Sequence, residues 1–346
     1  MSVNPPIRLK RGLQRALRHR GYALYRLTAE ERAAIERRDD RESLDSVFGP
    51  SLDRLQELRR RYSEVDLPVA IHSVWGARKT RRGTTDIGWG GVDLRNFRGH
   101  SAYVWDYGSA SFEATNLKFY LFTEAVRRKD RLGLLGTLTE DGAFGCSTYE
   151  YEGTGPVSRD LLDSVVEINF LDKHVGVVQR DDLRVLDIGA GYGRLAHRML
   201  EAQPRIQSFT CVDAVPESTF LCEFYLAERG LEERVSVVPL DELTTTFESN
   251  PDYNLAINVH SFSECTYAAV EWWLQRLVDL EVRHLMIVPN NPAAFLSLEV
   301  DHRRRDYAPL LDQLGFKLVA QEPVFDDPQV QALIGVRDNM FLFERC

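Results

Sequence analysis

The sequence predicts a doubly wound α/β fold, in which helices cover both faces of a mainly parallel sheet of seven strands. The main observation is a regular alternation of short apolar runs with helical stretches from about residue 183 onward. The apolar runs are continuous, which is typical of strands that are buried on both faces of a parallel sheet. Five such runs cover residues 184–188, 208–213, 235–238, 255–259 and 284–288.

Two more strands are predicted near the C-terminus and complete the seven. They cover residues 316–321 and 340–344, and they follow a predicted helix over 307–314 that Gly315 would end. Ligands of doubly wound sheets bind beyond the carboxyl ends of the strands. We therefore expect the functional residues to follow directly after the strands.

The first half of the chain has a different pattern. Helices are predicted over residues 51–62, 112–128 and 158–175, with Ser158 as the N-cap of the last one. We divide the chain into an N-terminal region, residues 1–157, which we expect to bind the acceptor ligand and to form a lid, and a cofactor-binding domain, residues 158–346. The N-terminal region is predicted to be a mostly helical extension that packs on the sheet. Its many aromatic residues, Trp75 among them, are expected to build a core, and none is assigned to a site.

Composition excludes several classes of protein. The 346 residues are 44% hydrophobic and 27% charged, with a net charge of -9, which excludes fibrous, collagenous and wholly disordered chains. The five cysteines never form CxxC pairs, which argues against a disulfide framework or a structural zinc site. No apolar run approaches the roughly 18 residues of a membrane span, and no signal peptide is apparent, so we expect a cytoplasmic protein. The acidic balance argues against broad nucleic-acid binding.

A basic arm precedes the first acidic residue, Glu30. It contains Arg8, Lys10, Arg11, Arg15, Arg18, Arg20 and Arg26. Such an arm can make peripheral contact with anionic lipid or bind a phosphorylated ligand. A solvated helix face explains the same residues, and the sequence leaves both interpretations open.

A glycine-rich turn follows the strand at 184–188. Its pattern DxGxGxG consists of Asp187, Gly189, Gly191 and Gly193, and glycines there let the backbone turn sharply against a ligand. The dinucleotide fingerprint GxGxxG would need glycine at position 194, which is Arg194. The turn instead resembles motif I of the class I S-adenosylmethionine-dependent methyltransferases, which have a Rossmann-like fold. This resemblance implies that S-adenosylmethionine is the cofactor.

Carboxylates after the next two strands support this interpretation. Asp213 ends the second strand, where a carboxylate can accept hydrogen bonds from both ribose hydroxyls. Asp241 follows the third strand, at a place where methyltransferases often contact the adenine, and Leu240 is available for packing. An ordinary turn carboxylate would explain any one of Asp187, Asp213 and Asp241. Three carboxylates at matching places at the ends of three successive strands favour a cofactor site.

A candidate base follows the fourth strand. Transfer of a methyl group to a hydroxyl needs an acceptor for the hydroxyl proton. His260 lies at the strand end, and Glu264 lies four residues further on. If a helix starts there, both lie on one face, and the carboxylate could orient the imidazole. A purely structural histidine is the alternative, and His302 is a reserve candidate.

The sequence segment 257–264 resembles a signature of the sugar O-methyltransferases found among bacterial polysaccharide genes. The segments 140–145, 157–164 and 167–171 resemble the region before motif I in that family, and the similarity covers about residues 100–345. The resemblance implies methylation of a sugar hydroxyl in a saccharide, glycolipid or polysaccharide precursor. It also implies that Ser158 and Arg159 help to hold the carboxylate end of the cofactor, although a helix cap equally explains Ser158.

Magnesium is not favoured as a second cofactor. Some sugar methyltransferases bind it through carboxylates after the fourth and fifth strands, where this chain has His260 and the pair Asn290 and Asn291. Neutral amides are poorer ligands for a hard cation. A further cluster, residues 301–306, is predicted to be a charged loop whose three arginines either clamp a sugar phosphate or are simply solvated.

Two other functions compete with sugar methylation. One is methylation of a non-sugar small molecule, such as a polyketide or a phenol. The other is a cofactor-binding partner protein that stabilises another protein and transfers nothing.

Overall fold

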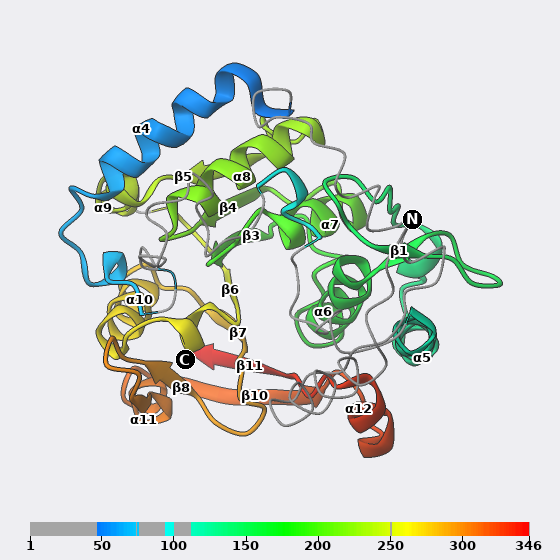
Figure 1. The fold of residues 1–346 in the computed structure, drawn as a ribbon. Helices are drawn as coiled ribbons and strands as arrows, with labels where there is room; N and C mark the ends of the chain where they lie inside the picture. The colour runs from blue at the N-terminus through cyan, green and yellow to red at the C-terminus, as the bar shows by residue number, and fades with distance from the viewer. Residues whose placement is uncertain (1–46, 74, 76–93, 100–111, 250, 346) are drawn as a thin grey trace, which may run out of the picture.

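The computed structural model describes residues 47–73, 75, 94–99, 112–249 and 251–345 (Figure 1). A seven-stranded sheet lies at its centre, with the order β10-β11-β7-β6-β3-β4-β5. Within it, β11 runs antiparallel to both of its neighbours, while the remaining pairs are parallel. The strands are β3 Arg184–Ile188, β4 Ser208–Val212, β5 Val235–Val238, β6 Leu255–Val259, β7 His284–Val288, β10 Phe316–Pro323 and β11 Asn339–Arg345. The predicted doubly wound, mainly parallel fold is confirmed.

Helices cover both faces of this sheet. Figure 1 shows α6 and α7 on one side and α10 and α11 on the other. The helices that follow the start of the sheet domain are α6 Arg159–Val175, α7 Arg194–Ala202, α8 Pro216–Glu228, α9 Leu243–Glu248, α10 Tyr267–Asp279, α11 Ala308–Gln313 and α12 Pro328–Ile334. The predicted N-cap is confirmed, because the Ser158 hydroxyl accepts a 3.1 Å hydrogen bond from the Leu161 amide.

The N-terminal region packs on the sheet domain. It contributes α4 Leu52–Tyr62, α5 Phe112–Lys129, β1 Thr148–Tyr149, β2 Val157–Ser158 and the short 3₁₀ helices Gly49–Ser51, Pro68–Ala70, Leu94–Asn96 and Leu134–Gly136. Helix α4 lies along α8, and the ion pairs Arg54–Glu223 (2.7 Å) and Arg59–Glu217 (2.8 Å) join them. The division at residue 157 stays a prediction, and the basic arm lies outside the described residues.

One predicted loop has a regular structure. The charged segment 301–306 belongs to a hairpin of β8 Leu296–Leu298 and β9 Arg304–Asp306. All of β9 is exposed, so the hydrophobic pattern carried no sign of a strand there. His302 lies at the tip of the hairpin with a φ of 66°.

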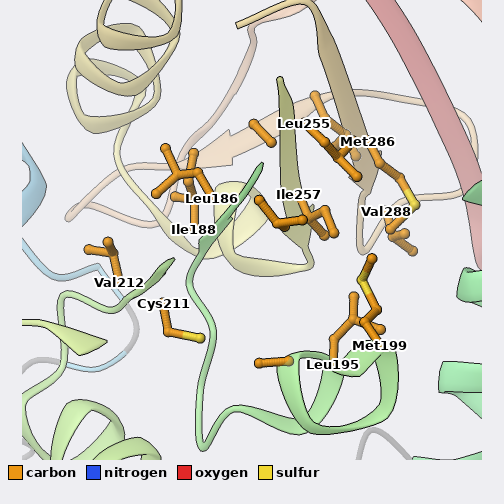
Figure 2. Packing of buried hydrophobic residues seen from close by; sticks show 14 of the residues in the cluster. Leu186, Ile188, Leu195, Met199, Cys211, Val212, Leu255, Ile257, Met286 and Val288 are labelled. Atoms are coloured by element: carbon orange, nitrogen blue, oxygen red, sulfur yellow. The ribbon is translucent and has the colours of Figure 1, made fainter. Parts of the chain in front are cut away.

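The core fixes the positions of the strand ends. Figure 2 shows Leu195 and Met199 of α7 turned toward the side chains of Met286 and Val288 on β7. Because these two α7 residues lie four apart, they share one face of the helix. Close packing of this kind holds the backbone at the strand ends rigidly. None of the helices in the described ranges is long and apolar enough to cross a membrane.

Candidate active site

A pocket opens at the carboxyl ends of β3, β4 and β6. It holds about 770 Å³ of empty space, part of which is open solvent. The sheet contributes Ile188, Gly189, Gly191, Val212, Asp213, Val259 and His260 to its lining. The pocket therefore lies where ligands bind in doubly wound folds.

The three glycines of the turn have different surroundings. All have a positive φ, 78° at Gly189, 58° at Gly191 and 85° at Gly193. A Cβ at Gly189 would lie 2.2 Å from the Ser261 hydroxyl, so this glycine allows close packing inside the protein. A Cβ at Gly191 would meet nothing within 4 Å, so this position borders the open part of the pocket.

Asp213 is tied to the turn. Its carboxylate accepts hydrogen bonds from the amides of Gly191 (3.0 Å) and Val215 (2.9 Å). Burial raises the pKa of Asp213 to about 7, against the lowering effect of these two bonds. The ionised form of a buried carboxylate is stabilised by further hydrogen-bond donors. The two hydroxyls of a ribose would supply such donors.

Asp187 lies behind the turn and outside the lining of the pocket. Its residue is 4% exposed, and its carboxylate accepts no hydrogen bond from the described residues. Burial raises its pKa to about 7, while Arg194 acts in the opposite direction. A buried carboxylate without donors is costly, so a ligand or water that supplied donors here would be favoured.

A buried polar network holds the other side of the turn. The hydroxyl of Tyr192, between Gly191 and Gly193, hydrogen-bonds to Asp160. Asp160 in turn pairs with the fully buried guanidinium of Arg98 at 3.1 Å. The segment 94–99 of the N-terminal region thus helps to position the glycine turn.

His260 has an unusual backbone. It has a φ of 67°, which is uncommon outside glycine, and its amide donates a 2.7 Å hydrogen bond to the Val288 carbonyl. Burial lowers the pKa of its imidazole to about 4, while Asp163 and Glu264 act to raise it. The imidazole is therefore neutral at physiological pH. Strained backbone of this kind is concentrated at functional sites.

Glu264 lies differently from the sequence-based expectation. Residues Ser261–Glu264 form a 3₁₀ helix rather than an α-helix, so a spacing of four residues no longer places Glu264 directly over His260. The Glu264 carboxylate lines the pocket and accepts hydrogen bonds from the indole of Trp75 (2.6 Å) and the amide of Asn290 (3.3 Å). These two contacts anchor neighbouring segments of the chain.

The two residues that were expected to contact the adenine, Leu240 and Asp241, lie outside the lining of the pocket. Leu240 is buried, and its amide donates to the Tyr62 hydroxyl at 2.9 Å. Asp241 pairs with Arg61 at 2.7 Å. In the described part of the chain, neither residue belongs to the lining of the pocket. Side chains of the N-terminal helix α4 bind both residues. The sequence around the third strand could not reveal these contacts.

Arg159 lies beside a second cavity. Its guanidinium pairs with Asp163 at 2.6 Å and approaches Asp338 at 3.8 Å. Besides its cap role, the Ser158 hydroxyl donates to Glu140 at 2.5 Å. Ser158 therefore holds the fold, while Arg159 is engaged with the two carboxylates of Asp163 and Asp338.

A strap from the N-terminal region covers the first pocket. We define it by its lining residues Val69, Ile71, His72 and Trp75. His72 forms an antiparallel bridge with Cys265, and the Ser73 hydroxyl donates to the Glu264 carbonyl. Trp75 is 38% exposed, so its predicted place in a core is wrong. No local pattern in the sequence marks this strap.

The basic hairpin does not form a clamp of three arginines. Arg303 pairs with Asp301, Arg304 donates to the Ser263 carbonyl at 2.9 Å, and Arg305 stacks 3.8 Å from the ring centroid of Tyr267. Within the described ranges, no group of three or more histidine, cysteine, aspartate or glutamate side chains could hold a metal ion. Whether activity needs magnesium stays a prediction.

Comparisons with known proteins give only distant likenesses. No family model and no curated protein matches the chain. Among solved structures, magnesium protoporphyrin IX methyltransferase from Synechocystis PCC 6803 with bound SAM is 14% identical, with a TM-score of 0.37, over 68% of this chain and 99% of that one.

Two further solved structures are similar. Mitomycin 7-O-methyltransferase MmcR is 21% identical over 54% of this chain and 57% of that one, with a TM-score of 0.37. The [4+2]-cyclase SpnF is 13% identical over 66% and 94%, with a TM-score of 0.40. Likenesses this distant do not carry over an activity, and the names include both methyltransferases and a cyclase. The chain's own strand order establishes its fold.

Proposed function

We propose that this protein is an S-adenosylmethionine-dependent O-methyltransferase that acts on a sugar hydroxyl of a saccharide, glycolipid or polysaccharide precursor. The observation that carries the proposal is the contact between the Gly191 amide and the Asp213 carboxylate at the edge of an open pocket. This contact brings a glycine turn and a ribose-binding type of carboxylate to one edge of the sheet.

The pocket fits the cofactor in three respects. Open space at Gly191 lets a ligand lie against the backbone. Asp213 offers carboxylate oxygens for ribose hydroxyls, and Ile71 and Trp75 of the strap offer apolar surface for a base. When bound, S-adenosylmethionine supplies a methyl group on a sulfonium sulfur, which departs as a neutral thioether.

His260 is the proposed proton acceptor. Because burial keeps its imidazole neutral, a ring nitrogen can take the proton of the acceptor hydroxyl while that oxygen bonds to the methyl carbon. The carboxylates of Asp163 and Glu264 favour the imidazolium that results. Trp75 of the strap and Trp273 of α10 give this space apolar walls.

The proposal of a sugar acceptor is based on the resemblance of residues 257–264, and of the region before motif I, to the sugar O-methyltransferases found among bacterial polysaccharide genes. A glycolipid or other carrier-linked acceptor would also give the basic arm a role at an anionic surface. Removal of residues 1–26 should then weaken binding to anionic vesicles, whereas unchanged binding would assign the arm to a solvated face.

The test is transfer of labelled methyl from S-adenosylmethionine to free sugars, nucleotide sugars and phenols. His260→Ala should keep its affinity for S-adenosylhomocysteine and lose about two to four orders of magnitude in turnover. His284→Ala is the matched control, because this histidine is the first residue of β7 and lies at the amino end of the strand, away from the pocket at the carboxyl ends. Methylation of phenols alone would contradict the sugar acceptor. Equal turnover of both variants and wild type would remove His260 from the mechanism.

A further inference from the structure

Asn258 links the segment of the proposed base to the glycine turn. It is the fourth residue of β6 and is fully buried. Its side-chain amide donates a 2.9 Å hydrogen bond to the carbonyl of Ile188, the residue directly before Gly189. The backbone pairing of β3 with β6 ends one residue earlier on each strand, at Asp187 and Ile257. The Asn258 side chain therefore continues the junction of the two strands beyond their paired backbones.

Ser261 adds a second contact at the same point. Its hydroxyl donates a 3.1 Å hydrogen bond to the Ile188 carbonyl and accepts one from the Asn258 amide. The backbone of Gly189 passes so close that an added Cβ would lie 2.3 Å from the Ser261 Cβ. The segment after β6 and the glycine turn after β3 are therefore packed directly against each other.

The carbonyl oxygen of the Asn258 side chain shapes the turn that carries His260. It accepts a 3.0 Å hydrogen bond from the Phe262 amide, four residues further on. Between these two residues, His260 has a φ of 67° and a ψ of -32°, a combination that is uncommon outside glycine. Such a backbone persists only where its surroundings hold it. Here the Asn258 cap and the 2.7 Å bond from the His260 amide to the Val288 carbonyl hold it.

The imidazole of His260 lies between two spaces of different size. One is the first pocket, which is open to solvent. The other is a second cavity, whose wall includes Asp163, Arg194 and Asp338 and which has room for about one water molecule. If the His260 backbone relaxed, the ring would therefore move toward the first pocket, where it would gain water.

We infer that Asn258, together with Ser261, positions the proposed base: the two side chains hold the His260 imidazole at a fixed place relative to a cofactor bound at the glycine turn. This inference rests on the proposed function. Asn258 does not line the first pocket, so among the described residues it acts through His260 rather than on a ligand. Such a link matters because misplacement of a reacting group by about 1 Å can cost on the order of a hundredfold in rate.

The test follows the His260 imidazole by NMR against pH, in protein labelled with ¹³C at the histidine Cε1. The signal is identified by its disappearance in His260→Ala. In wild type it should titrate with a pKa of about 4, because the ring is buried. In Asn258→Ala the pKa should rise by at least about one pH unit toward the ordinary 6.5, since the relaxed ring gains water. The charged groups that act on the ring are present in both proteins, and they are Asp163, Glu264, Arg194 and Arg159.

Asn254→Ala is the matched control. Asn254 directly precedes β6, and its side chain also joins this strand to the region of β3. Its oxygen accepts from the Arg184 amide at 3.0 Å, and its nitrogen donates to the Asp182 carbonyl at 2.7 Å. Because these contacts lie at the amino ends of the strands, their loss should lower the melting temperature and leave the His260 pKa unchanged.

Binding of S-adenosylhomocysteine separates the base from the cofactor turn. Both variants should bind it within about threefold of wild type, since the Gly191–Asp213 contact does not involve either asparagine. A larger loss in Asn258→Ala would assign Asn258 to the cofactor site and overturn the inference. An unchanged His260 pKa in Asn258→Ala, an equal rise in Asn254→Ala, or a wild-type pKa near 6.5 would overturn it as well.

Two further results are decided in advance. If Asn258→Ala does not fold, Ser261→Ala takes its place, because it keeps the Cβ beside Gly189 and loses only the hydroxyl. The His260 pKa should again rise, and an unchanged value would count against the inference. If wild type does not bind S-adenosylhomocysteine, the proposed function fails, while the titration still decides whether Asn258 positions the ring.

Discussion

The amide of Gly191 donates a 3.0 Å hydrogen bond to the carboxylate of Asp213, and this bond joins the turn after β3 to the end of β4. The two residues lie 22 positions apart in the chain. Asp213 also accepts from the Val215 amide, so its carboxylate is fixed in orientation beside the pocket before any ligand arrives. A site arranged in advance in this way needs little ordering when its ligand binds.

Replacement of Gly191 by alanine should weaken cofactor binding specifically. Its φ of 58° makes any side chain strained there, and the added methyl group would enter the open part of the pocket. Gly230 is the matched control, because it has a φ of 65° and also no neighbour within 4 Å of an added Cβ. Both alanine variants should lose about 1 kcal/mol of stability. Titration calorimetry should show a loss of at least about tenfold in S-adenosylhomocysteine affinity for Gly191→Ala alone.

Replacement of Asp187 by asparagine should stabilise the ligand-free protein at high pH. The folded-state pKa of about 7 lies above the ordinary 3.8, so the folded state binds the proton more tightly than the unfolded state. Wild type therefore loses stability relative to Asp187→Asn as the pH rises from about 4 to 7. The difference should reach on the order of 4 kcal/mol at pH 8 in urea unfolding.

Asp181→Asn serves as the control for this series, because the Asp181 side chain is 64% exposed and its replacement should change stability by less than about 0.5 kcal/mol. A constant difference between wild type and Asp187→Asn from pH 4 to 8 would show that Asp187 is ionised throughout. The same variant should bind S-adenosylhomocysteine more weakly if Asp187 serves the cofactor.

Replacement of Trp75 by phenylalanine should loosen the strap. Phenylalanine keeps an aromatic ring against the pocket and loses the N–H that donates to Glu264 at 2.6 Å. We expect S-adenosylhomocysteine to dissociate about two to ten times faster, as followed by stopped-flow fluorescence. Trp272→Phe changes a tryptophan of α10 that packs against Phe247 and Trp273, and it should leave the rate unchanged. An unaltered rate in Trp75→Phe would mean that the strap does not gate this pocket.

The sheet could be predicted because buried parallel strands carry continuous apolar runs. The predicted ranges 184–188, 235–238, 255–259 and 284–288 coincide with strands of the structure. The strand Arg304–Asp306 carries no apolar residue, and pairing with β8 rather than burial defines it. Hydrophobic pattern alone could not indicate such a strand.

The same contrast holds at the site. Gly191 and Asp213 could be located because they follow strands, and the sheet brings strand ends together. Trp75 could not be located, because its contact with Glu264 spans 189 positions and depends on how the N-terminal region crosses the sheet. Leu240 and Asp241 also follow a strand, but α4 takes up their hydrogen-bonding and charged groups.

Binding of S-adenosylhomocysteine to wild type and to Asp213→Ala, measured by titration calorimetry, tests the central claim most directly. The account predicts one site per chain in wild type and a loss of affinity of at least about tenfold in the variant, since hydrogen bonds to a charged group are lost. The absence of binding to wild type, or equal affinity in the two proteins, would contradict a cofactor site at the Gly191–Asp213 contact.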